Sequence, residues 1–345
     1  MRQLELRWNH KYRYPWIFFS ERPFTPTFIA ATSNLTSAPI SYELIPHSHW
    51  NTPSWIDTDR YMTSLSYLDH IGVGKGHMLS YHAMCRWNSG FFYAHPALAS
   101  YDFYWRVEPD VHFFCDIEYD VFRFMRDNDL KYGFNMNILD DARSFPSLWS
   151  QTKDFISKNP HLLHPDADLD WLLDSTGTYN NCQFFSNFEI GSLDFFRGEA
   201  NEAYFHHLDT RGGFYYERFG DAPIHTLSTS LFLPKYQQWF FRDIGYQHDT
   251  ARHCPPNMAG RCTCEATGLD ENFYKLVPME SPQRKPQDSC IRAWMGGEWV
   301  EKKQGWSGEA ERAFGGDGYH GVSLKIILVG VLALLLTWLC STLEM

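Results

Sequence analysis

Apolar residues along this chain follow two patterns, one typical of strands and one typical of helices. Runs rich in aromatic and β-branched residues occupy positions 14–19, 103–107, 132–139 and 239–244. Segments with helical spacing of apolar residues, and loops rich in Pro, Asn and Asp, separate these runs. Strands that alternate with helices in this way predict an α/β fold.

Two helices can be placed from their apolar positions and their end signals. In residues 148–158 the apolar side chains share one side, Ser147 is a candidate N-cap, and Asn159-Pro160 stops the helix. A second helix is expected over residues 193–209, ended by Gly212-Gly213. After about Asp249 the chain becomes rich in Pro, Cys and Gly without periodicity. We therefore expect one domain over residues 1–295 that ends in an irregular, Cys-rich C-terminal appendage.

The rest of the chain divides into a polar stretch and an apolar stretch. Residues 296–321 are rich in Gly, Glu and Lys, which predicts a linker. Residues 322–343 are apolar with little interruption, apart from Lys325 near their start. Their length is close to the ~20 residues that a membrane-spanning helix needs. We expect a transmembrane helix over 322–343, which would make a membrane one partner of the chain.

Composition narrows the classes of partner. The 345 residues carry a formal net charge of -11, and binding to nucleic acid needs a basic face, so the charge argues against a nucleic-acid partner. An anionic substrate must then be met locally, by a metal ion and a few arginines. Aromatic residues make up 17% of the chain, a content that suits well-packed layers and surfaces that face sugars.

The cysteines indicate an oxidising compartment. Four of the eight lie late in the chain, without the paired C-x-x-C spacing of a zinc ribbon: Cys254, Cys262, Cys264 and Cys290. We expect structural disulfides, with a metal site or free thiols as the alternatives. The sequon Asn34-Leu35-Thr36 also fits a secretory location.

Glu108-Pro109-Asp110 follows the strand-like run 103–107 and carries candidate chemistry. Residues i and i+2 of an extended segment point the same way, and proline disfavours a helix at this place, so both carboxylates can face one point. Mn²⁺ or Mg²⁺ held by only a couple of protein oxygens keeps coordination positions for a substrate diphosphate, as a nucleotide-sugar donor requires. The alternative is that the two acids only solvate the end of a strand.

The motif does not stand alone, because six runs in this order resemble one family. They are YHAMCRWNSGFFYAHPAL, YDFYWRVEPDVHFFCDIEYDVFRFMRDN, YGFNMNI, SNFEIGSLDFFRGEANEAYF, GGFYYERFGDAPIHTLSTSLFLP and DIGYQH. Over residues 4–290 the chain resembles the fungal Golgi α-1,2-mannosyltransferases of glycosyltransferase family fifteen. The resemblance implies a retaining enzyme that uses Mn²⁺ to move mannose from GDP-mannose to mannoside acceptors on N- or O-linked glycans. It also implies a Golgi membrane location with a lumenal catalytic domain.

For the fold, the resemblance implies a single-domain, GT-A-like (Rossmann-like) nucleotide-sugar transferase. This chain opens at RQLELRWNHKYRYPWIFF, which looks like the end of the family's first helix and its second strand. We therefore expect the fold to lack its first strand. Ligands of such sheets bind outside the carboxyl ends of central strands, so the loss would affect the sheet and the guanine pocket.

The resemblance assigns the metal and cofactor residues. Metal coordination falls on Glu108 and on His248 of GYQH, and Asp110 acts in the same site directly or through water. Without the motif, a single His with no spacing partner favours the interpretation of His248 as a surface imidazole near a loop, and the motif match reverses this. Arg86 and Arg106 flank the motifs and can offset diphosphate charge, or else pair with buried acids.

The resemblance also places the catalytic residues. Glu189 of SNFEIG is the candidate nucleophile, or else stabilises positive charge on the anomeric carbon during same-face attack. The structural alternative is a buried pair with Arg197 or Arg218. Asp221 would hold the acceptor hydroxyl. Tyr81 would approach the donor, or else be a core tyrosine with a satisfied hydroxyl.

Two classes of function follow from these residues. Glu108, Asp110, Glu189, Asp221 and His248 together favour an active mannosyltransferase. The missing strand favours a truncated, inactive relative that binds glycan or assists another enzyme.

Overall fold

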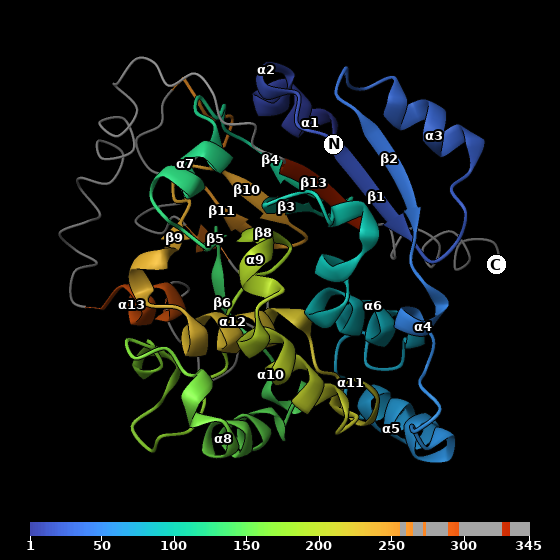
Figure 1. The fold of residues 1–345 in the computed structure, drawn as a ribbon, viewed down its shortest axis with the longest axis vertical. Helices are drawn as coiled ribbons and strands as arrows, with labels where there is room; N and C mark the ends of the chain where they lie inside the picture. The colour runs from blue at the N-terminus through green and yellow to red at the C-terminus, as the bar shows by residue number, and fades with distance from the viewer. Residues whose placement is uncertain (256–259, 265–271, 274–288, 297–325, 332–345) are drawn as a thin grey trace.

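A mixed seven-stranded sheet forms the centre of the protein in a computed structural model, which describes residues 1–255, 260–264, 272–273, 289–296 and 326–331 (Figure 1). The strand order is β2-β1-β13-β3-β8-β5-β9. The first four strands run parallel, β8 is antiparallel to both of its neighbours, and β5 and β9 are parallel to each other. Their bounds are Ile40–Leu44 (β2), Trp16–Ser20 (β1), Ile326–Val331 (β13), Phe103–Val107 (β3), Phe188–Ser192 (β8), Tyr132–Phe134 (β5) and Gln238–Phe240 (β9).

The two faces of the sheet are covered by different elements. Successive side chains of a strand point to opposite faces, so Tyr104 packs in one core cluster and Trp105 in the other. The cluster with Tyr104 includes residues from α5 (Thr58–His70), α6 (Leu79–Gly90), α8 (Leu148–Lys158), α10 (Glu199–Asp209), α11 (Gly213–Tyr216) and α12 (Asp221–Phe232), the helices drawn in the lower half of Figure 1. The cluster with Trp105 includes residues from the N-terminal segment and from α7 (Val121–Asp127).

A smaller antiparallel sheet extends from the carboxyl end of β3. Its order is β12-β11-β10-β4, with β4 at Val111–Phe113, β10 at Tyr246–His248, β11 at Ala251–His253 and β12 at Asn272–Phe273. Because His248 pairs with Val111 in register, this sheet brings the GYQH segment next to the end of Glu108-Pro109-Asp110.

Short elements connect these layers. A two-stranded ladder joins β6 (Asn137–Leu139) to β7 (Cys182–Phe184). The remaining helices are α1 (Arg2–Leu4), η1 (Glu5–Asn9), α2 (His10–Tyr12), α3 (Pro26–Ser33), α4 (His47–Trp50), η2 (Phe92–Ala94), η3 (Pro96–Leu98), η4 (Ala142–Ser144), η5 (Pro160–Leu162), η6 (Asp170–Leu172), α9 (Leu193–Phe196), η7 (Lys235–Gln237) and α13 (Ser289–Met295).

The elements expected from the sequence compare with these bounds as follows. The strand at 103–107 and the helix at 148–158 are confirmed. The run 14–19 forms β1, which ends one residue later than the run. The run 132–139 forms two strands, and the run 239–244 contributes only to β9. The helix expected over 193–209 is two helices, because Gly198 has extended backbone and begins α10. Ser147 makes no cap bond with its side chain, whose oxygen accepts from Gln151 Nε2 at 2.7 Å.

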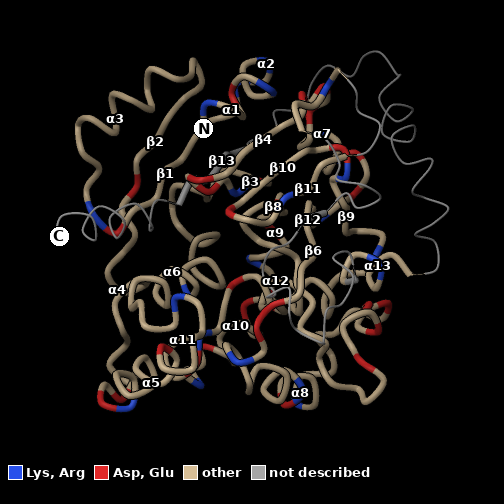
Figure 2. The backbone as a smooth tube through the Cα atoms, turned by 180° about the vertical axis from the view of Figure 1, so that it is seen from behind, with Lys and Arg blue, Asp and Glu red and all other residues tan. Residues whose placement is uncertain are grey.

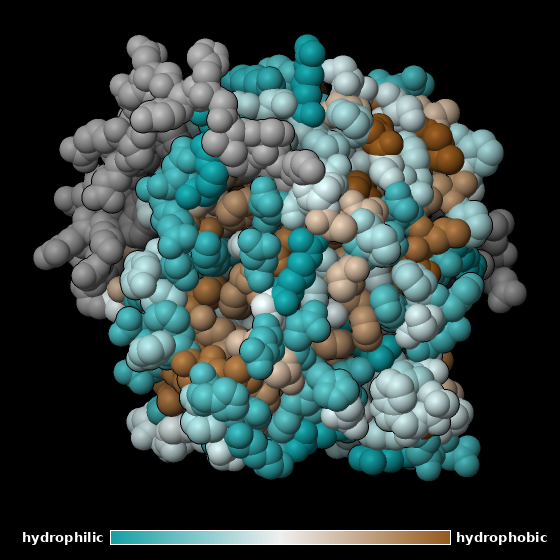
Figure 3. Space-filling view, in the orientation of Figure 1, coloured by the Kyte–Doolittle hydropathy of each residue, from teal (hydrophilic) through white to brown (hydrophobic). Residues whose placement is uncertain are grey.

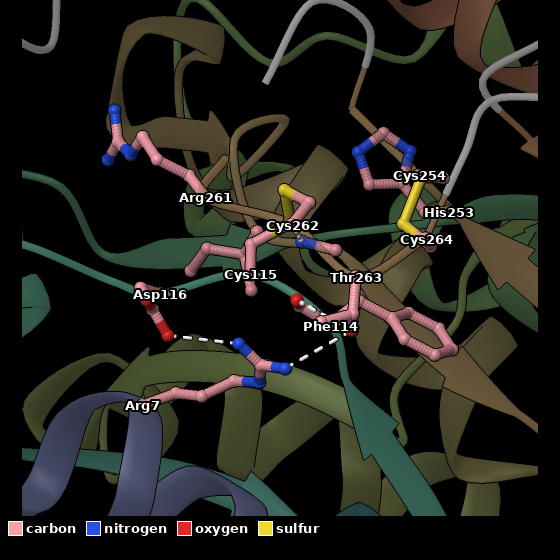
Figure 4. Close-up of a disulfide and its surroundings, with 12 residues drawn as sticks. Arg7, Phe114, Cys115, Asp116, His253, Cys254, Arg261, Cys262, Thr263 and Cys264 are labelled. Atoms are coloured by element: carbon pink, nitrogen blue, oxygen red, sulfur yellow. Dashed lines mark hydrogen bonds and ion pairs between the residues drawn. A yellow bond between two sulfur atoms is a disulfide. The ribbon is translucent and has the colours of Figure 1, made fainter. Parts of the chain in front are cut away.

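Three disulfides confirm the expected role of the late cysteines. Cys254 bonds to Cys264, whereas Cys262 and Cys290 reach back to Cys115 and Cys182. Figure 4 shows the Cys115–Cys262 and Cys254–Cys264 bridges. It also shows Arg7, which donates to Asp116 Oδ1 at 2.9 Å and to Thr263 at 3.2 Å. The appendage expected after about Asp249 is therefore tied covalently to the end of β4 and to β7.

Surface charges of both signs are spread over the elements in Figure 2, and hydrophobic patches lie among hydrophilic residues in the space-filling view of Figure 3. Large apolar side chains that are exposed around α5 and α6 include Trp55, Tyr67 and Leu79. Asn34 of the sequon is exposed and ends α3.

Strand β13 changes two expectations about the ends of the chain. The fold was expected to lack a strand, and the described sheet has β13 between β1 and β3, drawn in red in Figure 1. A helix was expected over 322–343, and Ile326–Val331 form a strand instead, since an apolar run of this kind suits a parallel strand with partners on both sides. Residues 322–325 and 332–343 lie outside the described residues, as does the linker expected over 296–321 apart from Gly296. Among the helices that the structure describes, none has the length and apolar character to cross a bilayer.

Proline at position 328 should weaken the pairing of β13 with its neighbours β1 and β3. Leu328 pairs with Trp16 of β1 and with Trp105 of β3. Its N–H therefore faces a paired strand whichever side of β13 it points to. Leu328→Pro removes that donor and leaves a carbonyl unpaired, which costs about 1–3 kcal/mol before any steric clash. We expect a lower thermal midpoint than in Leu328→Val, which keeps the N–H. Equal midpoints for the two variants would show that the β1–β3 connection does not depend on this strand.

Candidate active site

Arg106 lies at the centre of the candidate site. It belongs to β3, is 6% exposed, and shares with Tyr104 the face of the strand that meets the helices. Its Nε and Nη2 both donate to Glu108 Oε1, the former at 2.8 Å. Its Nη1 donates to Asp221 Oδ2, and the hydroxyl of Ser186 donates to the same oxygen at 2.6 Å. One guanidinium thus joins the end of β3 to the first residue of α12.

Burial makes these charges depend on one another. It disfavours the charged form of Arg106, but Asp221 and Glu108 raise the pKa of the guanidinium well above its usual value. Burial would raise the pKa of Asp221, but the charge of Arg106, the charge of His225 and the hydrogen bonds from Ser186 and Arg106 together outweigh it and lower that pKa. Asp221 is therefore ionised at neutral pH although it is only 5% exposed.

Asp110 and His248 form the second part of the site. The carboxylate Oδ1 and the imidazole Nε2 are 3.4 Å apart, held by the pairing of β4 with β10. The hydrogen bond from His248 lowers the pKa of Asp110, against burial, which raises it. The Nδ1 of His248 is buried and has no hydrogen-bond partner.

These side chains suit a hard divalent cation. Carboxylate oxygen and imidazole nitrogen are common ligands for ions such as Mn²⁺, and an orphaned imidazole nitrogen is a donor atom without another use. Both hydrogen bonds from Arg106 to Glu108 end on Oε1, so Oε2 takes no part in them. In the described part of the chain, no group of three or more His, Cys, Asp or Glu side chains is already gathered for a metal. The protein supplies a two-residue site with Glu108 two positions away in the chain.

Glu189 lies deeper than the other acids and is 0% exposed. It pairs in register with Arg106 across the β3–β8 ladder, so its side chain points to the same face of the sheet. Oε1 accepts from the hydroxyl of Tyr104 at 2.8 Å. Oε2 accepts from the hydroxyl of Tyr132 at 3.1 Å and lies 2.9 Å from Nδ1 of His225.

The arginines expected as partners of Glu189 are engaged elsewhere. Arg197 donates to the backbone oxygens of Tyr93, Leu98 and Tyr101, and Arg218 donates to Ser144 and lies 3.6 Å from Asp140. A tyrosine hydroxyl or an imidazole satisfies a buried carboxylate as an arginine does. The alternative that Glu189 is a buried acid paired with Arg197 or Arg218 was therefore wrong about the partner.

Arg86 and Tyr81 lie on α6. Arg86 holds Asp209 through two hydrogen bonds of 2.6 and 2.8 Å, and its guanidinium lies 4.6 Å from the ring centroid of Phe91. This geometry favours the structural alternative for Arg86 over contact with a diphosphate. Tyr81 is half-buried, and its ring lies 5.7 Å from the guanidinium carbon of Arg218. Burial raises the pKa of its hydroxyl, which stays a neutral donor.

Several partners of the site acids were missed in the sequence, among them Tyr104, Tyr132, His225 and Ser186. His225 follows Asp221 by four positions, and residues four apart on a helix share a face. A helix predicted over residues 221–232 would have placed His225 beside Asp221 from this spacing. Ser186 gave no such signal, because only the approach of α12 to the segment before β8 brings it to Asp221.

Residues 1–276 match the protein family described as "Glycolipid 2-alpha-mannosyltransferase". The chain is 43% identical over 270 residues to "Probable mannosyltransferase KTR3" of Saccharomyces cerevisiae, with 77% of this chain and 67% of the relative covered. It is 43% identical over 270 residues to "Glycolipid 2-alpha-mannosyltransferase 1" of Candida albicans, with coverages of 77% and 63%. The chain thus spans about two thirds of the length of these two relatives.

Two solved structures share the fold. One is core-mannan synthase A of Aspergillus fumigatus in a Mn/GDP form, with 46% identity and a TM-score of 0.75 over 79% of this chain and 74% of that one. The other is the mannosyltransferase Ktr4p of S. cerevisiae in complex with GDP, with 35% identity and a TM-score of 0.77 over 87% and 78%. Sequence and fold agree, and the chain belongs to the glycolipid 2-alpha-mannosyltransferase family of glycosyltransferases.

Proposed function

We propose that this protein is a retaining α-1,2-mannosyltransferase that moves mannose from GDP-mannose to a mannoside acceptor on N- or O-linked glycans. The observation that carries this proposal is the cluster at the end of β3, where Arg106 holds Glu108 and Asp221 and where Asp110 meets His248. An anionic donor in a chain of net charge -11 needs such a local arrangement. The Mn/GDP form of the Aspergillus relative supports Mn²⁺ and a guanosine donor.

Glu108, Asp110 and His248 would hold the Mn²⁺, which when bound would supply charge neutralisation at the donor diphosphate. Asp221 stays ionised, so it can accept a hydrogen bond from the acceptor hydroxyl and orient it. Arg106 fixes that carboxylate and the position of Glu108 with one set of hydrogen bonds.

Glu189 would act as a fixed negative charge rather than as a covalent nucleophile. Both of its oxygens accept hydrogen bonds and its side chain is sealed from solvent, which lowers its reactivity toward carbon. A buried carboxylate near the sugar still stabilises positive charge that develops on the anomeric carbon. This arrangement favours same-face attack over a glycosyl-enzyme.

The disulfides support a Golgi lumenal location, because such bonds persist in an oxidising compartment. The alternative of an inactive, glycan-binding relative is not favoured, since the expected acids and imidazole lie together at the strand end.

Loss of the His248 imidazole should weaken the Mn²⁺-dependent binding of GDP. His248→Gln is expected to weaken Mn²⁺-dependent GDP binding by about 10–100-fold or more and to reduce mannose transfer to α-methyl mannoside in parallel. His77 is a matched control, because it is an exposed histidine 3.0 Å from Asp69 on the surface. Calorimetry with GDP over a range of Mn²⁺ concentrations checks the first effect. If His77→Gln and His248→Gln bind alike, His248 is not a ligand.

Removal of Arg106 should destabilise the fold in a pH-dependent way. Arg106→Met leaves Glu108 and Asp221 buried without a counter-charge, at a cost of about 3–5 kcal/mol near pH 7. Arg106 lowers the pKa of Asp221 against burial, so in the variant the folded pKa of Asp221 rises above its unfolded value. Asp221 then takes up a proton as the pH falls, so the loss of stability shrinks toward pH 5.

Arg197→Met is the control for this measurement, because Arg197 donates to backbone carbonyls and its loss leaves no carboxylate behind. Urea unfolding at pH 7 and pH 5 compares the two variants. A loss for Arg106→Met that is the same at both pH values would contradict the assigned role.

A further inference from the structure

His225 is fully buried on α12, and each of its ring nitrogens has one partner. Nε2 lies 3.0 Å from the backbone oxygen of Asn88 on α6. Nδ1 lies 2.9 Å from Oε2 of Glu189 on β8. The imidazole therefore bridges the helix layer and the sheet through two fixed contacts.

The contact with Asn88 determines where one proton sits. A backbone carbonyl oxygen only accepts hydrogen bonds, so Nε2 must carry a hydrogen. Nδ1 and Glu189 Oε2 then share a single further proton. Either the ring is an imidazolium and Glu189 is a carboxylate, or the ring is neutral and Glu189 is a carboxylic acid.

The other groups around the dyad favour the charged pair. Tyr104 and Tyr132 both donate to Glu189, and hydroxyl donors stabilise the ionised carboxylate. Burial, together with Glu189 itself, raises the pKa of both phenols well above the usual value, so they stay protonated. Burial lowers the pKa of His225, and the charge and hydrogen bond of Glu189 outweigh it and raise that pKa.

The surrounding charges come from β3 and from α12 itself. Arg106 on β3 and Asp221 on α12 both act on His225, with opposite effects on its pKa. Two apolar rings also lie close, with the ring centroid of Phe196 4.8 Å and that of Phe92 6.4 Å from the imidazole centroid. The titratable and charged groups that face the dyad are thus Tyr104, Tyr132, Arg106 and Asp221.

We propose that His225, as an imidazolium, is a positioning residue that keeps Glu189 ionised and correctly oriented for the transfer reaction. The proposal rests on the proposed function in one respect, namely that the charge of Glu189 acts on the sugar.

Charge balance shows what the imidazolium changes. With Arg106 and His225 positive and Glu108, Asp221 and Glu189 negative, the cluster carries one excess negative charge. Moving the shared proton to Glu189 keeps that total but removes the negative charge from the residue that would face the sugar. With a neutral side chain at position 225, Glu189 either keeps a buried negative charge that no imidazolium compensates or takes up a proton from solvent. Its ionisation then depends on pH.

Two neutral variants separate the contacts of His225. Asn at position 225 places its amide near the position of Nδ1 and keeps a donor toward Glu189. Gln places its amide near Nε2 and keeps the contact with Asn88. Both lack the positive charge, so we expect kcat at pH 7 to fall on the order of 100-fold in each, with a smaller change in KM. In both variants kcat should rise with pH as Glu189 ionises, while the wild type stays flat over the same range.

A purely structural role would give a different result. Loss of packing lowers activity by the same factor at every pH, so a pH-independent fall in kcat would overturn the proposal, as would an unchanged kcat. In a Glu189→Gln background, His225→Asn should cause no further loss, since His225 acts through Glu189.

The proton itself gives a readout that does not depend on transfer activity. In ¹⁵N spectra of the histidine-labelled wild-type protein, one ring should stay protonated on both nitrogens between pH 5 and pH 8, and its signal should vanish in His225→Gln. A ring at this position that is neutral at pH 7 would overturn the proposal even in an active enzyme. If the ring is charged but the wild type transfers no mannose, the proposed function fails while the charged dyad stands.

Discussion

One buried positive charge, on Arg106, determines how the acids of this protein are arranged. Glu108 and Asp221 come from a strand end and from a helix N-terminus, and neither carboxylate would stay ionised in its buried place alone. By meeting both, Arg106 fixes α12 against β3. That contact also sets the position of His225, one turn further along α12, against Glu189. The acids are thus organised by a shared counter-charge before any ligand arrives.

The frame that carries Arg106 depends on contacts between distant segments. Strand β3 is held by β8 on one side and by β13 on the other, and among the described strands only β13 connects it to β1. The disulfide between Cys115 and Cys262 fixes the segment after β4, close to the end of the Glu108 motif. A buried charge network tolerates little movement, because a displaced partner leaves an unpaired ion in a low dielectric. Covalent and sheet constraints on both sides of β3 meet that requirement.

The sequence predicted those parts of the fold and the site that are local. The strand at 103–107 and the helix at 148–158 follow from composition and end signals, and the i, i+2 spacing of Glu108 and Asp110 is a property of the strand end. Whether Arg86 faces a ligand or Asp209 was not predictable, because residues 123 positions apart meet only in the folded helix layer. The tail shows the same limit. An apolar run fits a membrane helix or a central strand equally well, and in Ile326–Val331 its pairing partners β1 and β3 decide.

Glu189 shows how far geometry restricts mechanism beyond what a motif can. A carboxylate that bonds covalently to a sugar must bring a free lone pair to the anomeric carbon, whereas two phenols and an imidazole already take most of the acceptor positions of Glu189. Formation of a bond to carbon would neutralise the carboxylate, so the donors around it in this fully buried position would have to rearrange, at a cost of about 1–3 kcal/mol for each one left unpaired. Stabilisation of a developing positive charge requires no such rearrangement, because the field of an ionised carboxylate extends beyond its hydrogen bonds. In the proposed mechanism, the buried network that stabilises the ionised form of Glu189 therefore favours its action as a fixed charge over its action as a nucleophile.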